Sequence, residues 1–430
     1  MRIHSALVCQ LDWIVRYSTP LFLRLVLPSA ISRLFRPSLA VLLTFLATSS
    51  VATETRSLTS DAASSFSELS ARADAARDGD RLDEAISLYR RALVLRPSWA
   101  EGWWSLGTVY YDRDAYDKAA VSFKKMIALQ PQNGTAQAML GLCEFELGRE
   151  QLALRHIQKG KSLGLQKNPE LWQVVLYHEG VLLQRKGSLQ AAQDTLEELC
   201  LQAGQSDRVA AVLGMTMLRL SDNEPPSPGS ADADLVLRVG RAECLAGQKK
   251  YDDARSAFEE VAKQYPNFPN VHYAFGLFLI ELRDVTESIV QFKQEIANHP
   301  ENVLSRLRIA SVEYKEDSAA GIPYAEEAVK LDPQQPFGHY LLGLLRLDVD
   351  DYRGAIPELE IAQKAFSHEA RIFLALATAY SRAGRKQDAI RARARFQRLT
   401  NESKTISGNP APAESDVTSI PVADAPALPQ

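Results

Sequence analysis

The sequence lacks several features that mark common functional classes. Its four cysteines, Cys9, Cys143, Cys200 and Cys244, are far apart and include no C-x-x-C pair, so their spacing indicates neither a structural zinc site nor a clustered disulfide framework. With 49 basic and 53 acidic residues among 430, the formal net charge is -4. The chain therefore has no global basic excess of the kind that nucleic-acid-binding proteins carry, and we expect no nucleic-acid partner.

The sequence also contains no complete catalytic motif of the kinds considered, and two short matches each lack a required residue. His178-Glu179 begins an H-E-x-x-H metal-binding motif, but Leu182 stands where the second histidine is needed. Gly160-Lys161-Ser162 resembles the end of a phosphate-binding loop, yet Arg155 occupies a position that requires glycine. The seven histidines are dispersed and form no i, i+4 pair. We therefore expect no enzyme activity, no cofactor and no metal site.

The first 52 residues have the composition of a targeting segment. They contain five arginines and a single acid, Asp12, followed by an apolar run at 39–47 that is too short to span a bilayer comfortably. Small residues follow, and 50–52 would serve as a cleavage site. This pattern predicts a signal peptide and an exported protein, periplasmic or extracellular. Two alternatives stay open: an uncleaved membrane anchor that also uses 21–27 and keeps the protein near the membrane, and an organelle transit peptide.

Prolines recur at a nearly fixed spacing in the rest of the chain. Pro97 and Pro131 are about 34 residues apart, as are Pro266 and Pro300, and Pro333 follows at nearly the same distance. Where the pattern is clearest, the proline follows a stretch in which an aromatic residue comes four positions after an alanine. This combination predicts a helix that ends at a turn, repeated along the chain.

A second helical run precedes each of these stretches and contains an apolar residue followed by glycine. Examples are 106–107, 140–141, 275–276 and 342–343. Apolar residues at i, i+3, i+4 and i+7 around these pairs mark one buried helix face. Because glycine in the middle of a helix lowers stability, its recurrence predicts that two helices approach closely at this position.

These residues resemble the tetratricopeptide repeat, a helix-turn-helix unit of about 34 residues, and the whole chain is similar to exported bacterial arrays of that family. One unit carries nearly the whole signature, in Trp103, Leu106, Gly107, Tyr110, Ala119, Phe123 and Pro131. The resemblance implies an all-α right-handed superhelix, a solenoid of about nine such repeats. The predicted units start near Phe66, Ala100, Gly134, Gln173, Leu235, Pro269, Val303, Pro336 and Ala370.

The predicted domain organisation follows from breaks in this array. The segments are a leader at 1–52, a linker at 53–65, an N-terminal block of four repeats at 66–220, a Pro/Ser-rich linker at 221–231, a C-terminal block of five repeats at 232–400 and a disordered tail at 401–430. The apolar stretch at 209–220 fits no repeat and is expected to be an unpaired helix that caps the first block.

The family resemblance also implies a binding surface. Such arrays bind protein segments in a concave groove lined by the second, fifth, ninth and twelfth positions of each first helix. The predicted partner-binding residues are Trp104, Thr108, Tyr111, Leu142, Phe145, Tyr273, Leu277, Tyr314, Phe337, Tyr340 and Leu344. These are mostly aromatic and aliphatic, whereas family members that hold a chaperone's terminal carboxylate use lysine, arginine and asparagine there. We therefore expect peptide or helical segments with apolar anchors as partners.

Together these patterns predict a non-catalytic scaffold or adaptor for protein–protein interaction. The alternatives are a non-catalytic accessory subunit of a separate enzyme or envelope assembly complex, and a self-assembling structural protein whose groove is filled by a second copy. The partner and the oligomeric state are left open by the sequence. So is the state of Cys143, Cys200 and Cys244, which are expected to be buried thiols but could form a disulfide in an exported protein.

A run of basic residues marks the last predicted helix. Its members are Arg382, Arg385, Lys386, Arg391, Arg393, Arg395 and Arg398. A terminal repeat needs a polar outer face, so the favoured interpretation is a solvated capping helix. The alternative is docking to an anionic membrane surface or an acidic partner.

Overall fold

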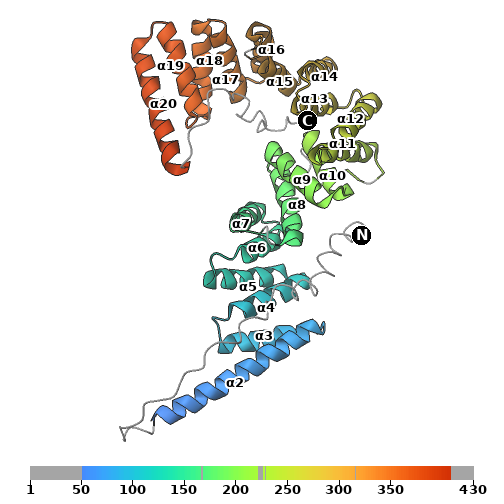
Figure 1. Ribbon diagram of the computed structural model, residues 1–430, viewed down its shortest axis with the longest axis vertical. Coiled ribbons are helices and arrows are strands. Elements are labelled where there is room, and N and C mark those ends of the chain that lie inside the picture. The colour runs from blue at the N-terminus through green and yellow to red at the C-terminus, as the bar shows by residue number, and fades with distance from the viewer. Residues whose placement is uncertain (1–50, 166–167, 221–225, 228, 315, 408–430) are drawn as a thin grey trace. The chain divides into compact units, whose positions relative to one another are not determined.

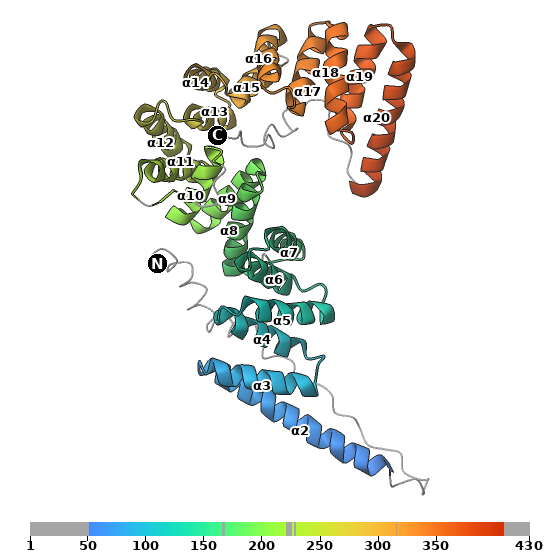
Figure 2. The same ribbon diagram turned by 180° about the vertical axis from the view of Figure 1, so that it is seen from behind.

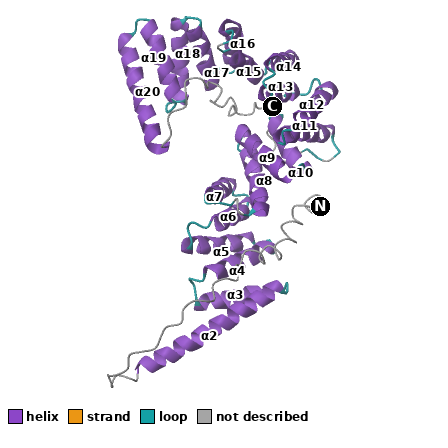
Figure 3. Cartoon of the chain, viewed as in Figure 1, coloured by secondary structure: helices purple, strands orange, loops and turns teal. Residues whose placement is uncertain are grey.

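The structure is a computed structural model that describes residues 51–407 except 166–167, 221–225, 228 and 315. Within these residues the chain forms only helices, turns and loops (Figure 3). Of the predicted leader at 1–52, residues 1–50 lie outside the described residues, and so do residues 408–430 of the predicted tail. Residues 401–407, which were predicted to be part of a disordered tail, form the end of the last described helix. The sequence predicted a linker at 53–65, but these residues form part of the first described helix. In the described part of the chain, no helix combines the length and the apolar character needed to cross a membrane.

The chain divides into two compact units, 1–175 and 176–430. The first unit contains α2 (Val51–Asp78), α3 (Leu82–Leu95), α4 (Ala100–Asp112), α5 (Tyr116–Leu129), α6 (Gly134–Glu146), α7 (Glu150–Ser162) and the start of α8 (Pro169–Arg185). The second contains the rest of α8, then α9 (Leu189–Ala203), α10 (Asp207–Met217), α11 (Ala231–Gly247), α12 (Tyr251–Gln264), α13 (Val271–Glu281), α14 (Val285–Asn298), α15 (Val303–Glu313), α16 (Ser318–Leu331), α17 (Pro336–Asp348), α18 (Tyr352–Ala365), α19 (Ala370–Arg382) and α20 (Lys386–Ser407).

The predicted repeat of helix pairs is confirmed. The described helices form the pairs α2/α3, α4/α5, α6/α7, α8/α9, α11/α12, α13/α14, α15/α16, α17/α18 and α19/α20, with α10 outside this series. Several first helices begin at the predicted residue, as at Ala100, Gly134, Val303, Pro336 and Ala370. Successive pairs stack on one another within each unit, which both views show (Figure 1 and Figure 2).

The recurrent glycines lie where the two helices of a pair touch. A β-carbon at Gly107 would lie 2.8 Å from the Phe123 ring, and one at Gly276 would lie 2.5 Å from the Phe292 ring. The equivalent contact occurs at Gly343, whose β-carbon would lie 2.6 Å from Leu359. Each of these large partners is fully buried. The glycine thus makes room for the core residue of the second helix, as the sequence predicted.

The turn between the two helices of a pair has a recurrent backbone conformation. A residue with positive φ follows many first helices, for example Asp80, Asp114 and Gly148, which are spaced by one repeat length, about 34 residues. Beside Asp114, the amide of Ala115 donates to the carbonyl of Tyr110 at 2.9 Å and closes the helix end. This left-handed residue reverses the chain within a few residues and lets the second helix pack back on the first.

The sequence predicted an unpaired capping helix at 209–220, but helix α10 is paired with α11. Residues 209–217 pack closely against α11, so this helix is not an unpaired cap. A β-carbon at Gly214 would lie 1.9 Å from the carbonyl oxygen of Val236, and one at Gly240 would lie 1.7 Å from that of Ala210. The two backbones therefore touch where the glycines face each other. This packing joins the helices on either side of 221–231 within a single compact unit.

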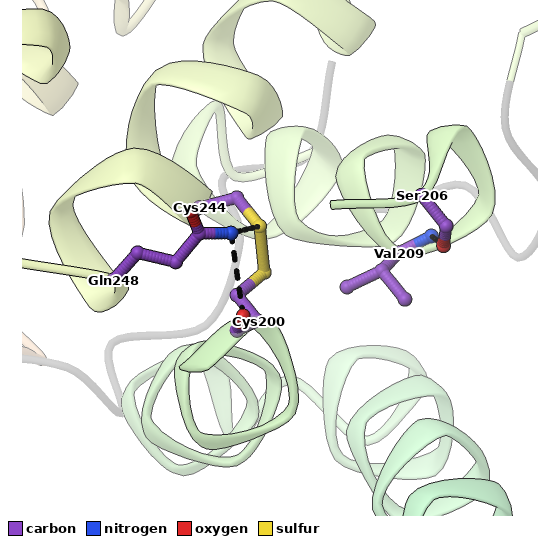
Figure 4. Close-up of a disulfide and its surroundings, with 5 residues drawn as sticks. All are labelled: Cys200, Ser206, Val209, Cys244 and Gln248. Atoms are coloured by element: carbon purple, nitrogen blue, oxygen red, sulfur yellow. Dashed lines mark hydrogen bonds between the residues drawn. A yellow bond between two sulfur atoms is a disulfide. The ribbon is translucent and has the colours of Figure 1, made fainter. Parts of the chain in front are cut away.

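A disulfide reinforces the same region. Cys200 on α9 is bonded to Cys244 on α11, with Cα atoms 5.4 Å apart, while Cys143 is a buried free thiol. Figure 4 shows the bond between the two helices, with the Gln248 side chain donating to the Cys200 carbonyl at 3.3 Å. The bond closes a loop that contains α10. It settles the pairing of the three cysteines that the sequence left open.

The Gly214–Gly240 contact predicts that Gly240→Ala destabilises the second unit. Its methyl group overlaps a backbone carbonyl that cannot move without separating α10 from α11, so we expect the free energy of unfolding to fall by about 3 kcal/mol. Urea unfolding followed by circular dichroism measures this change. Gly338→Ala is the matched control: the nearest atom would be 3.3 Å away, and the stability should stay within about 1 kcal/mol of wild type. Equal effects of the two substitutions would contradict the close packing.

The disulfide predicts a thermal shift under reducing conditions. Because a cross-link over 44 residues restricts the unfolded chain, its loss should lower the stability of this region by roughly 2 to 4 kcal/mol. We expect dithiothreitol to lower the Tm of wild type and of Cys143→Ala to a similar extent. The Cys200→Ser, Cys244→Ser double variant should melt at the lower temperature with or without reductant. Equal melting temperatures of the wild type and the double variant without reductant would contradict the bond.

Candidate functional site

The predicted groove residues fall on first helices of both units. In the first unit they lie on α4 and α6, and in the second on or directly after α13, α15 and α17. The structure therefore brings them together as two rows, each within its own unit. Seven of the predicted side chains are buried: Thr108, Tyr111, Leu142, Tyr273, Phe337, Tyr340 and Leu344. Four are half-buried: Trp104, Phe145, Leu277 and Tyr314.

The buried members contribute mainly to packing between and within repeats. The Tyr111 ring meets Tyr116 edge-on, with centroids 5.3 Å apart, and the Thr108 hydroxyl donates to the Ser105 carbonyl at 2.9 Å. Tyr340 is 1% exposed, and its burial raises its pKa. A ligand that approaches the first helices meets little of these side chains. The accessible apolar surface belongs to the half-buried members.

Half-buried apolar side chains form a regular row in the second unit. Ile280 on α13, Tyr314 directly after α15, and Leu347 on α17 occupy the same register, since successive members are separated by about 34 residues, one repeat length. Together with Leu277 they pack against one buried core cluster while keeping part of their surface in solvent. Their shared register places similar apolar surface on three successive repeats. In the first unit, the half-buried Trp104 has its ring centroid 5.5 Å from that of Phe123, but it lies at the fifth position of its helix, and Tyr111, the residue in the register of the row, is buried.

Two arginines converge on a tyrosine beside this row. The Tyr273 hydroxyl on α13 accepts from Arg219 at 3.1 Å and from Arg308 at 3.5 Å, and the Arg219 guanidinium lies over the Tyr273 ring. Burial alone raises the pKa of Tyr273, but the two positive charges outweigh it and hold the pKa below its usual value. Sequence reasoning missed this cluster, because Arg219 follows α10 and lies outside the repeat register.

Acidic side chains meet beside the disulfide. Gln193 on α9 donates to Glu197 at 2.7 Å and to Glu243 of α11 at 2.6 Å. Burial raises the pKa of Glu243 well above its usual value, and the nearby Glu197 carboxylate raises it further. Burial also raises the pKa of Glu197 and of Glu281 on α13. The raised pKa values of Glu197 and Glu243 favour the protonated form of these carboxyl groups, and Gln193 bridges them.

No described cluster of histidine, cysteine, aspartate or glutamate has an arrangement that could hold a metal ion. A surface depression of 670 Å³ is lined by residues of α12, α13 and α14 and by Asp284. Arg255 and Asp284 neutralise each other at its edge, at 2.7 Å. His178 and Glu179, the incomplete motif of the sequence, lie on α8 and gather no such cluster within the described residues.

Comparisons with known proteins identify the repeats. The tetratricopeptide repeat family profile matches residues 70–134 and 340–400, and a second tetratricopeptide repeat profile matches residues 238–267. The matched segments lie in both units and coincide with helix pairs of the structure. The chain is therefore an all-α array that contains tetratricopeptide repeats, as its sequence resemblance predicted. No curated protein matches the sequence.

Several solved structures of repeat proteins resemble part of the chain. The structure of MamA from residue 41 to its end, from Desulfovibrio magneticus RS-1, is 20% identical, with a TM-score of 0.36, over 40% of this chain and 97% of the solved chain. A double mutant of MamA from RS-1 is 19% identical, with a TM-score of 0.37 over the same shares. YrrB, described as a TPR protein with an unusual peptide-binding site, is 21% identical, with a TM-score of 0.34, over 44% of this chain and 90% of YrrB.

The Glu197–Glu243 pair predicts that stability falls as the pH rises. A carboxyl group with a raised pKa in the folded state contributes stability that is complete below the usual glutamate pKa of 4.5 and is lost as the pH rises through the raised value. We expect Glu243→Gln to flatten this decline in a series of Tm measurements from acid to neutral pH. Glu260→Gln, an exposed change on α12, should keep the wild-type profile. A wild-type Tm that rises steadily over this range would contradict the prediction.

Proposed function

We propose that the protein is a non-catalytic adaptor that binds apolar segments of other proteins along its first helices. The observation that supports this function is the row of Ile280, Tyr314 and Leu347, which offers similar half-buried apolar surface on three successive repeats. An extended or helical segment with regularly spaced apolar side chains would place one anchor on each repeat. A few such anchors supply most of the binding energy in protein interfaces.

The charges near the row favour a particular kind of segment. Arg308 on α15, which donates to the Tyr273 hydroxyl at 3.5 Å, places positive charge near the α13 end of the row. A carboxylate in the bound segment would be attracted there, and such charge complementarity raises specificity and association rate. The preferred ligand is therefore a segment whose apolar anchors are preceded or followed by an acidic residue.

We also propose that the protein is exported. Its support is the Cys200–Cys244 disulfide, because structural disulfides persist mainly in oxidising compartments. The Arg-rich leader with its short apolar run fits the same location. An N-terminal sequence of the mature protein from the native host would start near residue 53 if the leader is cleaved, and at Met1 if it serves as an anchor.

A displayed library of random peptides tests the adaptor function. Peptides enriched on the wild-type chain are measured by fluorescence anisotropy against Ile280→Ser, Leu347→Ser. We expect the Kd to rise at least tenfold, because each lost anchor contributes about 1 kcal/mol or more. The matched control is Val290→Ser, Ile361→Ser, which changes exposed apolar side chains on α14 and α18, the second helices of the same pairs.

Two outcomes would overturn the adaptor function. Either no peptide is enriched, or the control pair weakens binding as much as the groove pair. Sedimentation of the same variants addresses self-assembly: if a second copy fills the row, the wild type associates and the Ile280→Ser, Leu347→Ser variant becomes monomeric, whereas the control pair does not.

A further inference from the structure

The last described helix, α20, is covered on one side only. Ala389, Ala392 and Leu399 are buried on its inner side, which packs against α19. Ile390, on the opposite side, keeps 57% of its surface exposed. No later repeat among the described residues covers this outward side, as expected for the end of an array.

The outward side of α20 has a distinct pattern of charge. At 100° per residue, Ile390 lies near its centre, Lys386 and Arg393 lie along one edge, and Arg391 and Arg398 lie along the other. All four cations are exposed. Basic residues on an exposed helix face are attracted to anionic lipid, and an exposed apolar residue among them can enter the interface between headgroups and acyl chains.

These cations are only partly neutralised within the protein. Asp388 is the single acid between residues 386 and 400, and it pairs with Arg385 and Arg391. Lys386, Arg393 and Arg398 form no ion pair with a described carboxylate. Three positive charges are thus available for an external anion. Arg395 is not among them, because it is half-buried and donates to the Ser367 carbonyl.

We propose that the outward face of α20, formed by Lys386, Ile390, Arg391, Arg393 and Arg398, docks on an anionic phospholipid membrane. The basic side chains bind lipid phosphates, and Ile390 enters the boundary between headgroups and acyl chains. This proposal is independent of peptide binding on the first helices. It adds a second interaction surface at the opposite end of the second unit from α10.

The shape and composition of this face favour a membrane over other anionic partners. It is the convex side of a single helix, which fits a plane and offers no groove for a peptide. Protein interfaces have cores depleted in charged residues, whereas this face has one exposed apolar side chain among basic ones. Single-stranded nucleic acid requires aromatic stacking, and the outward face has no aromatic side chain, since Phe396 is half-buried on the inner side.

Vesicle flotation with the full-length chain tests the proposal. The vesicles contain phosphatidylcholine alone or with phosphatidylglycerol. Because the Arg-rich leader also favours anionic lipid and is the same in every variant, the comparison between variants isolates the contribution of α20. The test variant is Lys386→Gln, Arg393→Gln, Arg398→Gln. The control variant makes the same change of net charge at Lys293, Lys330 and Lys364, which are exposed on α14, α16 and α18.

We expect the wild type to bind anionic vesicles and to lose this binding at high salt. Each cation near an anionic surface raises the affinity for it by a factor of about five. The test variant lacks three cations and should therefore bind roughly one hundredfold more weakly. The control variant should bind within about threefold of wild type, because its lysines lie outside the docking face. Ile390→Ser should also weaken binding to anionic vesicles, while leaving the weak attraction to soluble polyglutamate unchanged.

Three results would overturn the proposal. The first is equal flotation with and without phosphatidylglycerol. The second is an equal loss of binding in the test and control variants, which would assign the effect to net charge. The third is tight binding to polyglutamate that does not respond to Ile390→Ser, which would indicate an acidic protein partner. Circular dichroism of all variants verifies that the helices remain folded.

Discussion

The structure depends on one contact, the approach of a glycine on the first helix of a pair to a large side chain on the second. Gly107 with Phe123, Gly276 with Phe292 and Gly343 with Leu359 are the same contact in three repeats. It fixes how closely and at what register two helices pack, and the left-handed turn residue between them fixes the reversal. Once this geometry is set, equivalent positions of successive first helices lie on the same face, but their burial differs between repeats: Trp104 is half-buried, whereas Tyr273 and Tyr340 are buried.

The repeat architecture could be predicted from the sequence because its contacts are local and periodic. Proline, glycine and aromatic positions recur with the period of the repeat, and the helices follow them. The pairing of α10 with α11 was not predictable in this way, since it depends on Gly214 and Gly240, which fit no repeat. The candidate site was harder to predict from the sequence than the fold. Family positions identified Tyr273 and Tyr340, but only the packing shows that they are buried, while Leu277 and Tyr314 stay half-exposed.

In the second unit, two clusters of side chains with shifted pKa values lie near α10, the helix that interrupts the repeat array. Around the α9–α11 junction, a proton-sharing carboxyl pair lies beside the disulfide, and two arginines after α10 and on α15 surround the Tyr273 hydroxyl. In the second cluster, Tyr273 and Arg308 belong to first helices of regular repeats, whereas Arg219 lies outside the repeat register. Arg219, which directly follows the inserted helix α10, thus contributes a positive charge beside Tyr273 that lies outside the repeat register.

The position of the Cys200–Cys244 bond has a consequence for how the array behaves as a whole. In a linear stack each repeat is stabilised only by its nearest neighbours, so the weakest junction decides where cooperativity breaks down. Here the junction between the fourth and fifth pairs is interrupted by α10, and it is the one that carries a covalent link. Fluctuations that open the stack elsewhere cannot separate α9 from α11. An oxidising environment therefore couples the repeats on the two sides of the insertion into a single cooperative segment.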